Sequence, residues 1–253
     1  MSWLTFVIVC PLVGLAGFVD AIAGGGGLIS LPAYLLTGVP AHMAIGTNKL
    51  SSGMGTLVAT AEFARSGYIR VKLALLAVIC AIIGANFGSH LALMLSDHWF
   101  RLFLLVVLPL TALYLLWHKS ALATTPTIAL SPQKTTVYTG LIAVVLGAYD
   151  GFYGPGAGTF MLLALTAIAH LPLHDAAGTT KVINLTTNLT SLVVFLFNGK
   201  VYLLLGVAAG IFSILGNHLG ATYFKHFGGR GARPLILLVL TIFFGKTLWD
   251  LMH

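Results

Sequence analysis

The sequence predicts an all-α polytopic membrane protein with a duplicated helical repeat and a glycine-broken helix, discontinuous or re-entrant, in each half. Of its 253 residues, 58% are hydrophobic and only 8% are charged, whereas about a quarter of a typical soluble domain is charged. Long apolar runs recur along the whole chain, and a ten-residue block containing a lysine occurs twice. A soluble fold of this size could not bury so much apolar surface, so we expect the lipid bilayer to surround the protein.

The apolar runs define the expected helices in order. A helical crossing takes about 20 residues, and the long runs cover residues 3–22, 42–64, 71–95, 99–117, 136–152, 175–197, 201–224 and 233–251. Two shorter runs, Leu28 to Thr37 and Thr159 to Ala169, each follow a glycine-rich break. We expect these short runs to be either half-helices that cross the membrane or re-entrant segments.

An internal repeat divides the chain into a first membrane repeat (1–118), an inter-repeat loop (119–135) and a second membrane repeat (136–253). The block from Pro40 to Lys49 shares six of its ten positions with the block from Pro172 to Lys181, 132 residues later. Asp20 and Asp150 each precede a glycine break by four residues. Agreement at this many ordered positions indicates a duplication.

The basic residues of the connections indicate how the two repeats are oriented. With four crossings in each half, the repeats are parallel and the basic residues are spread almost evenly over both sides. With five crossings, the repeats are inverted and only Arg101 and Lys200 face away from the basic side. That side would hold Arg65, Arg70, Lys72, Lys119, Lys134, Lys225, Arg230 and Arg233. The sharper second distribution favours inverted repeats with both termini outside, and parallel repeats remain the alternative.

The glycine breaks are candidate anion-binding elements. A helix that restarts after a break exposes free N–H groups and the positive end of its dipole, which hold anions in transporters with broken helices. Close helix packing is the alternative explanation for the glycines, and neither break has the ending of a nucleotide-binding loop. The candidates are Gly24, Gly25, Gly26, Gly27, Gly154, Gly156 and Gly158.

The duplicated lysines are the second candidate element. Lys49 and Lys181 each lie seven residues after a histidine, too far from a helix end to reach water easily. A cation in such a place needs a partner, which is either an anionic substrate or a structural ion pair with Asp20 or Asp150. The neighbouring side chains would donate hydrogen bonds to an oxyanion; they are Thr47, Asn48, Thr179 and Thr180.

Four titratable residues are candidates for binding a coupling proton or sodium ion. Asp20 and Asp150 stand in apolar surroundings near lysines, which suits a coupling site and suits a structural bond at a helix end equally. His42 and His174 stand at the start of the lysine-bearing helices, where a proton sensor or a simple interfacial residue is expected. The sequence shows no metal-ligand pattern and no cofactor motif, so we predict neither.

The aspartate before the glycine run, followed by Leu31-Pro32, by Gly46-Thr-Asn-Lys49 and by the degenerate second copy, resembles the sulfite exporter (TauE/SafE-type) permease family. The resemblance covers essentially the whole chain and is strongest to small bacterial members. It implies a multi-pass permease of the bacterial inner membrane, usually described with eight helices. It also implies a substrate such as sulfite, sulfoacetate or another small organic anion, moved by ion-coupled transport.

The predicted function is therefore alternating-access transport of a small anion, and the protein is not expected to be an enzyme. An anion channel is the first alternative, because channels and carriers use similar broken helices. An intramembrane aspartyl protease using Asp20 and Asp150 is the second, although it would not need the duplicated lysines. No nucleic-acid partner is expected, since the basic residues lie in connections between helices. The sequence leaves a homodimer open.

Overall fold

The structure is a computed structural model that describes residues 3–96, 99–100, 102–103, 106–107, 110 and 130–227, with no strand in these ranges. The helices of the first half are α1 (Trp3–Ala23), α2 (Gly27–Leu36), α3 (Ala41–Arg65) and α4 (Val71–Met94). Those of the second half are α6 (Pro132–Phe152), α7 (Ala157–Ala167), α8 (Leu173–Phe197) and α9 (Leu203–Phe227). The predicted run 233–251, most of the run 99–117 and the loop residues 119–129 lie outside the described residues.

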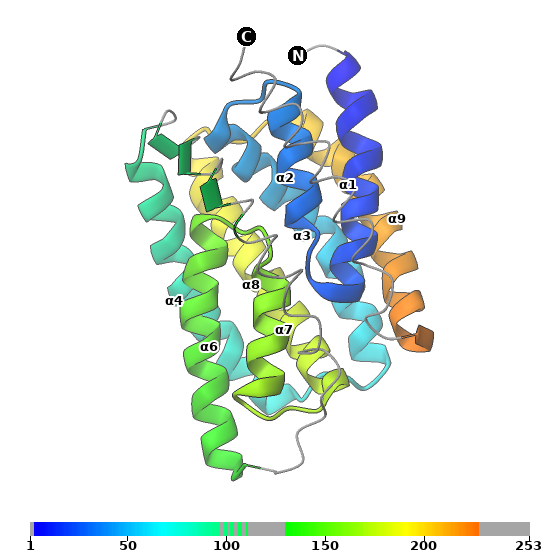
Figure 1. Cartoon of the computed structure of the whole chain (residues 1–253), viewed down its shortest axis with the longest axis vertical. Helices are drawn as coiled ribbons and strands as arrows, with labels where there is room; N and C mark the ends of the chain where they lie inside the picture. Colours follow the sequence, from blue (N-terminus) through cyan, green and yellow to red (C-terminus); the bar gives the residue numbers. More distant parts are fainter. Residues whose placement is uncertain are drawn as a thin grey trace.

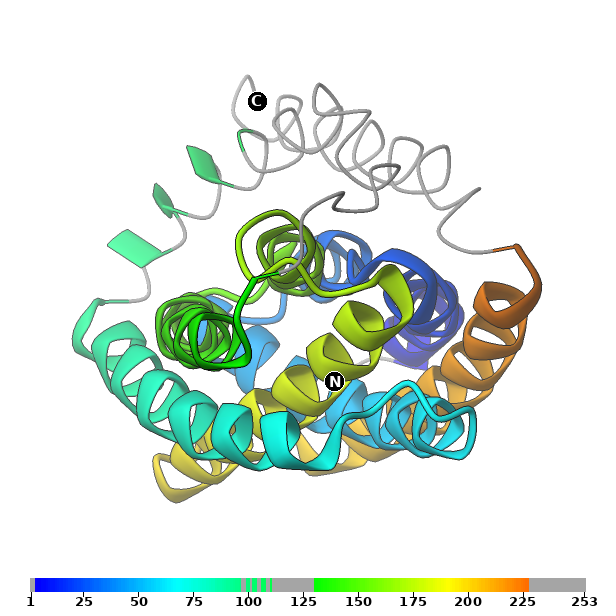
Figure 2. The ribbon, with the colours of Figure 1, turned by 90° about the horizontal axis from the view of Figure 1, so that it is seen from below.

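Each helix of the first half runs in the opposite direction to its counterpart in the second half. In Figure 1, α1 and α3 descend from the end where the N-terminus lies, whereas α6 and α8 rise from the other end. Figure 2 shows α4 and α9 on opposite flanks of the bundle. The most extensive helix contacts join α1 to α9 and α4 to α6, so each half packs its first helix on the other half. An inverted repeat would have this arrangement, and the duplication itself stays a prediction.

The start of α6 differs from the predicted boundary at residue 136. The helix begins at Pro132, and the Ser131 side chain accepts a hydrogen bond from the N–H of Lys134. Serine is a preferred N-cap residue and proline fits the first helical turn, because its missing N–H would have no partner there. The last residues of the predicted loop 119–135 are therefore helical, since these start signals outweigh the polar composition.

Glycines allow the two main helix pairs to approach closely. A Cβ atom on Gly216 of α9 would lie 1.9 Å from the carbonyl oxygen of Gly14 in α1. A Cβ atom on Gly88 of α4 would lie 2.0 Å from the carbonyl oxygen of Ala148 in α6. Only a residue without a side chain fits at such distances. These glycines belong to Gly-x-x-x-Gly pairs of α4 and α9, a spacing that is typical of closely packed membrane helices.

Five of the described helices, α1, α4, α6, α8 and α9, are long and apolar enough to cross a membrane. Helix α3 has 25 residues, the same length as α8, but has fewer large apolar side chains beside its polar ones. Many of these, including Thr47, Lys49 and Ser51, are buried inside the bundle, whereas α4 exposes Ile79, Ile83 and other large apolar side chains. The bundle thus buries polar side chains within its core and exposes apolar ones, as a membrane-embedded protein does.

Candidate functional site

The two glycine breaks meet inside the bundle. A Cβ atom on Gly24 would lie 2.3 Å from the carbonyl carbon of Gly158. Gly24 and Gly154 have φ angles of +70° and +95°, which glycine adopts without the steric penalty of a Cβ atom. The Thr159 hydroxyl donates a hydrogen bond of 2.6 Å to the carbonyl oxygen of Ala23 at the end of α1. These contacts bring the N-terminal ends of α2 and α7 together.

Lys49 connects α3 to the end of α6. Its Nζ atom lies 2.8 Å from Oδ1 of Asp150 and 2.7 Å from the Asp150 carbonyl oxygen. Both side chains are buried, with 3% of Lys49 and 7% of Asp150 exposed. The hydroxyl of Thr187 donates a hydrogen bond to the other carboxylate oxygen, Oδ2. Both oxygens of this buried carboxylate therefore have partners, as buried charges require.

Lys181 makes the corresponding connection from α8 to the end of α1. Its Nζ atom lies 2.7 Å from Oδ2 of Asp20 and also donates to the Asp20 carbonyl oxygen. The lysine side chain is 3% exposed and the aspartate 19% exposed. The last carbonyls of a helix lack intrahelical donors and carry the negative end of its dipole, so each ammonium group also stabilises a helix C-terminus. The sequence analysis offered two partners for the lysines, an anionic substrate or an aspartate. In the structure each lysine pairs with an aspartate.

A cavity, which we call the central cavity, lies where the breaks and the ion pairs converge. It encloses about 370 Å³ between its atoms, including the part open to solvent. Both aspartates and one lysine contribute to its wall, together with glycines and amide or hydroxyl side chains. The lining residues are Asp20, Gly24, Gly27, Asn48, Lys49, Ser52, Thr56, Asp150, Gly154, Ala157, Gly158, Asn184 and Asn188.

Backbone donors without a partner lie at the start of α2, where Gly27 lines this cavity. In the described part of the chain, the backbone N–H groups of Gly25, Gly26 and Gly27 have no protein acceptor, because the first intrahelical bonds of α2 begin at Leu28. The N-terminal end of α2, which follows α1 directly, therefore has free N–H groups. Such free donors at a helix N-terminus, next to an ammonium group, form an environment that attracts anions.

Comparison with known proteins places the chain in a family. The family model described as "Sulfite exporter TauE/SafE" matches residues 9–247. The chain belongs to this family. A "Probable membrane transporter protein" of Haemophilus influenzae is 34% identical over 239 residues, which cover 93% of this chain and 91% of that protein. The "Probable membrane transporter protein YfcA" of Escherichia coli K12 is 30% identical over 240 residues, covering 93% and 87%. No solved structure matches significantly.

The family and these relatives show that the TauE/SafE protein described here is a membrane transporter. The resemblance inferred from Asp20, the glycine run and the Gly-Thr-Asn-Lys block is therefore confirmed. The names of the relatives give no substrate, and the family description names sulfite. The all-helical, multi-pass fold class is likewise confirmed by the described helices and the five candidate spans.

Some of the residues predicted to bind substrate lie outside the central cavity of this TauE/SafE protein. The Thr47 hydroxyl accepts a hydrogen bond of 2.9 Å from the N–H of Tyr202, which connects α3 to the α8–α9 turn. Thr179 and Thr180 are buried and do not line the cavity. Among the predicted glycines, Gly26 lines a neighbouring cavity, and Gly25 and Gly156 line neither. The binding roles of these residues stay predictions.

The two histidines, candidates for proton sensors or simple interfacial residues, lie away from the central cavity. His42 is buried, its Nε2 atom lies 3.0 Å from the carbonyl oxygen of Ala92, and its ring stacks on Phe100 at 4.9 Å. His174 packs against the ring of Tyr68 at a centroid distance of 4.6 Å. Neither histidine contributes to the cavity wall. The structure thus brings Asp20 and Asp150 together with Lys49 but leaves both histidines at the helix starts.

The sequence analysis missed four polar residues of the cavity wall: Ser52, Thr56, Asn184 and Asn188. Two signals could have revealed them. Asn48, Ser52 and Thr56 recur every four residues, which places them on one face of α3. Ser52 and Asn184 are 132 positions apart, as are Thr56 and Asn188, so polar residues recur at matching places in both halves.

The two carboxylates of this TauE/SafE protein do not form an aspartyl dyad. Asp20 pairs with Lys181 and Asp150 pairs with Lys49 and Thr187. Two catalytic aspartates would instead share one proton between neighbouring carboxyl groups. The arrangement therefore favours the transporter reading over the protease that the sequence alone had left as an alternative.

Proposed function

We propose that this protein carries a small anion, a sulfur-containing oxyanion or organosulfonate, through the central cavity by alternating access. The observation that supports this most directly is the meeting of a free helix N-terminus with Lys49 at one cavity. Backbone N–H groups and an ammonium group bind compact oxyanions together. The family description, which names sulfite, supports the same substrate class.

The ion pairs leave capacity for a ligand. An ammonium group has three N–H donors, and Lys49 uses two of them on Asp150. The four central charges, Lys49, Lys181, Asp20 and Asp150, sum to zero, so the aspartates do not leave a net negative charge that would repel an anion. An entering anion would accept a hydrogen bond from the remaining lysine N–H group and from the free N–H group of Gly27, which lines the cavity.

Transport would follow from motion of one half against the other. Each ion pair joins a helix of the first half to a helix of the second, and both lie at helix ends next to the glycine breaks. We propose that a substrate bound at this junction is exposed to one side and then the other as the halves rock, in the inner membrane of a bacterium. A gradient of protons or sodium ions would drive the cycle.

The test is thermal unfolding of the purified protein with a panel of anions: sulfite, sulfate, thiosulfate, sulfoacetate, taurine and short carboxylates. A ligand that binds only the folded protein raises its unfolding temperature by mass action. We expect one sulfur oxyanion to stabilise the wild type. Gly27→Ala should lose the response, because Gly27 lines the cavity and its added Cβ would lie 2.9 Å from Pro155 Cα, which forces the start of α2 to shift. Gly53→Ala is the matched control, since its Cβ would make only an ordinary 3.6 Å contact. No response to any anion would contradict the proposal.

A further inference from the structure

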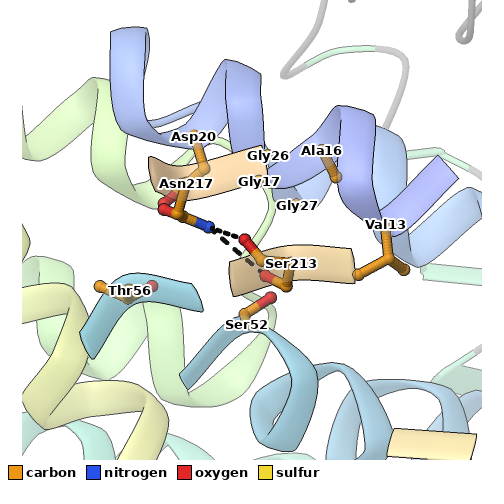
Figure 3. A pocket seen from close by; sticks show the side chains of 10 residues that line it. All are labelled: Val13, Ala16, Gly17, Asp20, Gly26, Gly27, Ser52, Thr56, Ser213 and Asn217. Atoms are coloured by element: carbon orange, nitrogen blue, oxygen red, sulfur yellow. Dashed lines mark hydrogen bonds between the residues drawn. The ribbon is translucent and has the colours of Figure 1, made fainter. Parts of the chain in front are cut away.

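We infer that a sodium ion binds beside Asp20, in a second cavity that the second half of the protein does not reproduce. This cavity, which we call the side cavity, encloses about 230 Å³ including its opening. Figure 3 shows Asp20, Asn217, Ser213, Ser52 and Thr56 around it. As a coupling site it rests on the proposed anion transport, whereas binding of the cation can be measured without any transport.

The two aspartates differ in their unused hydrogen-bonding capacity. Both oxygens of Asp150 are occupied, one by Lys49 and the other by Thr187. Asp20 uses only Oδ2, on Lys181, and within the described residues its Oδ1 atom has no hydrogen-bond partner. A carboxylate oxygen that no protein donor occupies is available as a ligand for a cation.

The two aspartates differ in this way because the residues around them differ between the two halves. Thr187, which occupies the second oxygen of Asp150, has Gly55 as its counterpart 132 positions earlier. Gly55 leaves room for two polar side chains of α9: a Cβ on it would lie 2.2 Å from Ser213 Oγ and 2.3 Å from Asn217 Nδ2. The counterparts of Ser213 and Asn217, by the same spacing, are the small apolar residues Ala81 and Ala85.

Asn217, which lines the side cavity, has a side-chain oxygen without a hydrogen-bond partner among the described residues. The residue is only 1% exposed. Its Nδ2 atom donates to the carbonyl oxygen of Ser213 at 3.0 Å, as the dashed lines in Figure 3 show. Its Oδ1 atom is buried and has no hydrogen-bond partner among the described residues. Leaving a buried acceptor unpaired costs free energy, and a bound cation would supply the missing partner.

The chemistry of the side cavity fits a hard monovalent cation. Its side-chain oxygens come from a carboxylate, an amide and hydroxyl groups, which suit sodium rather than softer metals, and its wall also holds the Asn217 amide nitrogen and the N–H groups of Gly26 and Gly27. No group of three His, Cys, Asp or Glu residues that would hold a transition metal occurs among the described residues. The cavity also adjoins the C-terminal turn of α1, whose negative dipole end favours a cation.

Coupling to the anion follows from the charge balance. The central and side cavities share Asp20, Gly27, Ser52 and Thr56 in their walls. An anion that enters the central cavity adds negative charge to a group of residues whose charges sum to zero. A sodium ion next to Asp20 restores neutrality, so each ion raises the affinity for the other.

The experiment is a sodium titration of the purified wild type in detergent at constant chloride, with choline or potassium as the replacement ion and no substrate anion. We expect sodium alone to raise the unfolding temperature in a saturable way. Asn217→Ala and Ser213→Ala each remove one oxygen ligand. We expect each to raise the half-saturating sodium concentration about tenfold, corresponding to about 1.4 kcal/mol.

Two glycine variants separate the site from general stability. Gly55→Ala places a Cβ against Ser213 and Asn217 and should abolish the sodium response, whereas Gly53→Ala on the same helix should keep it. A wild type that responds equally to sodium, potassium and choline overturns the proposal. A response that survives in both ligand variants, or stabilisation by acid with none by sodium, overturns it as well. Because the anion panel is run in choline buffer, loss of the cation site and loss of anion binding give separate results.

Discussion

Breaking the ion pair of Lys49 and Asp150 should destabilise the fold more than any surface change. In Lys49→Met, the Asp150 carboxylate is left 7% exposed without a cation, and its carbonyl oxygen loses a donor at 2.7 Å. Removal of one partner from a buried pair costs about 3–5 kcal/mol, because an uncompensated charge stays in a low-dielectric interior. The Thr187 hydroxyl remains as a donor, so we expect the lower part of this range.

The assay is unfolding in mixed micelles with an increasing fraction of denaturing detergent, for Lys49→Met, Asp150→Asn and the double variant. The double variant no longer contains a buried unpaired charge, so its loss should be smaller than the sum of the two single losses by about 1–3 kcal/mol. Additive losses, or a loss below about 1 kcal/mol for Lys49→Met, would refute the reasoning. Lys181→Met should cost less, because Asp20 is 19% exposed and keeps partial contact with water.

Three further predictions use the same assay. Gly216→Ala should destabilise by about 1–3 kcal/mol or more, because its Cβ would lie 1.9 Å from a carbonyl oxygen of α1 and would force the helices apart; an effect as small as that of Gly53→Ala would contradict the close packing. Thr187→Val should lower the free energy of unfolding by about 1–3 kcal/mol, because it removes a donor from Asp150. Thr180→Val should lower it much less, because the Thr180 hydroxyl has no partner among the described residues. Equal losses in the two variants would count against this role of Thr187. Arg70→Ala should cost less than about 1 kcal/mol, because the arginine of its pair with Asp175 is 56% exposed, and a loss near that of Lys49→Met would show that exposure does not decide these energies.

Much of the fold was predictable because apolar runs and glycine breaks are local signals. Helices α2 and α7 begin at Gly27 and Ala157, within two residues of the predicted starts at Leu28 and Thr159. The ion pairs were predicted only as an alternative. Which lysine meets which aspartate depends on how helices of different halves pack, and no sequence spacing encodes that.

The polar walls of the two cavities were harder to predict. A single Ser, Thr or Asn in an apolar helix is common, and its importance depends on the face it occupies. Asn217 and Ser213 have alanines as repeat counterparts, so the search for matching residues in both halves could not identify them. Residues that differ between the two halves can be identified only from the structure, by comparing the side chains that pack around Asp20 with those around Asp150.

The most direct test of the central claim is uptake of a labelled sulfur oxyanion, the one that stabilises the purified protein, into proteoliposomes. A carrier with one central site predicts saturable uptake that is faster when the same anion is loaded inside, is lost in Gly27→Ala and is kept in Gly53→Ala. Uptake that does not depend on the anion inside would indicate a channel. Uptake that Gly27→Ala leaves unchanged would contradict anion binding in the central cavity.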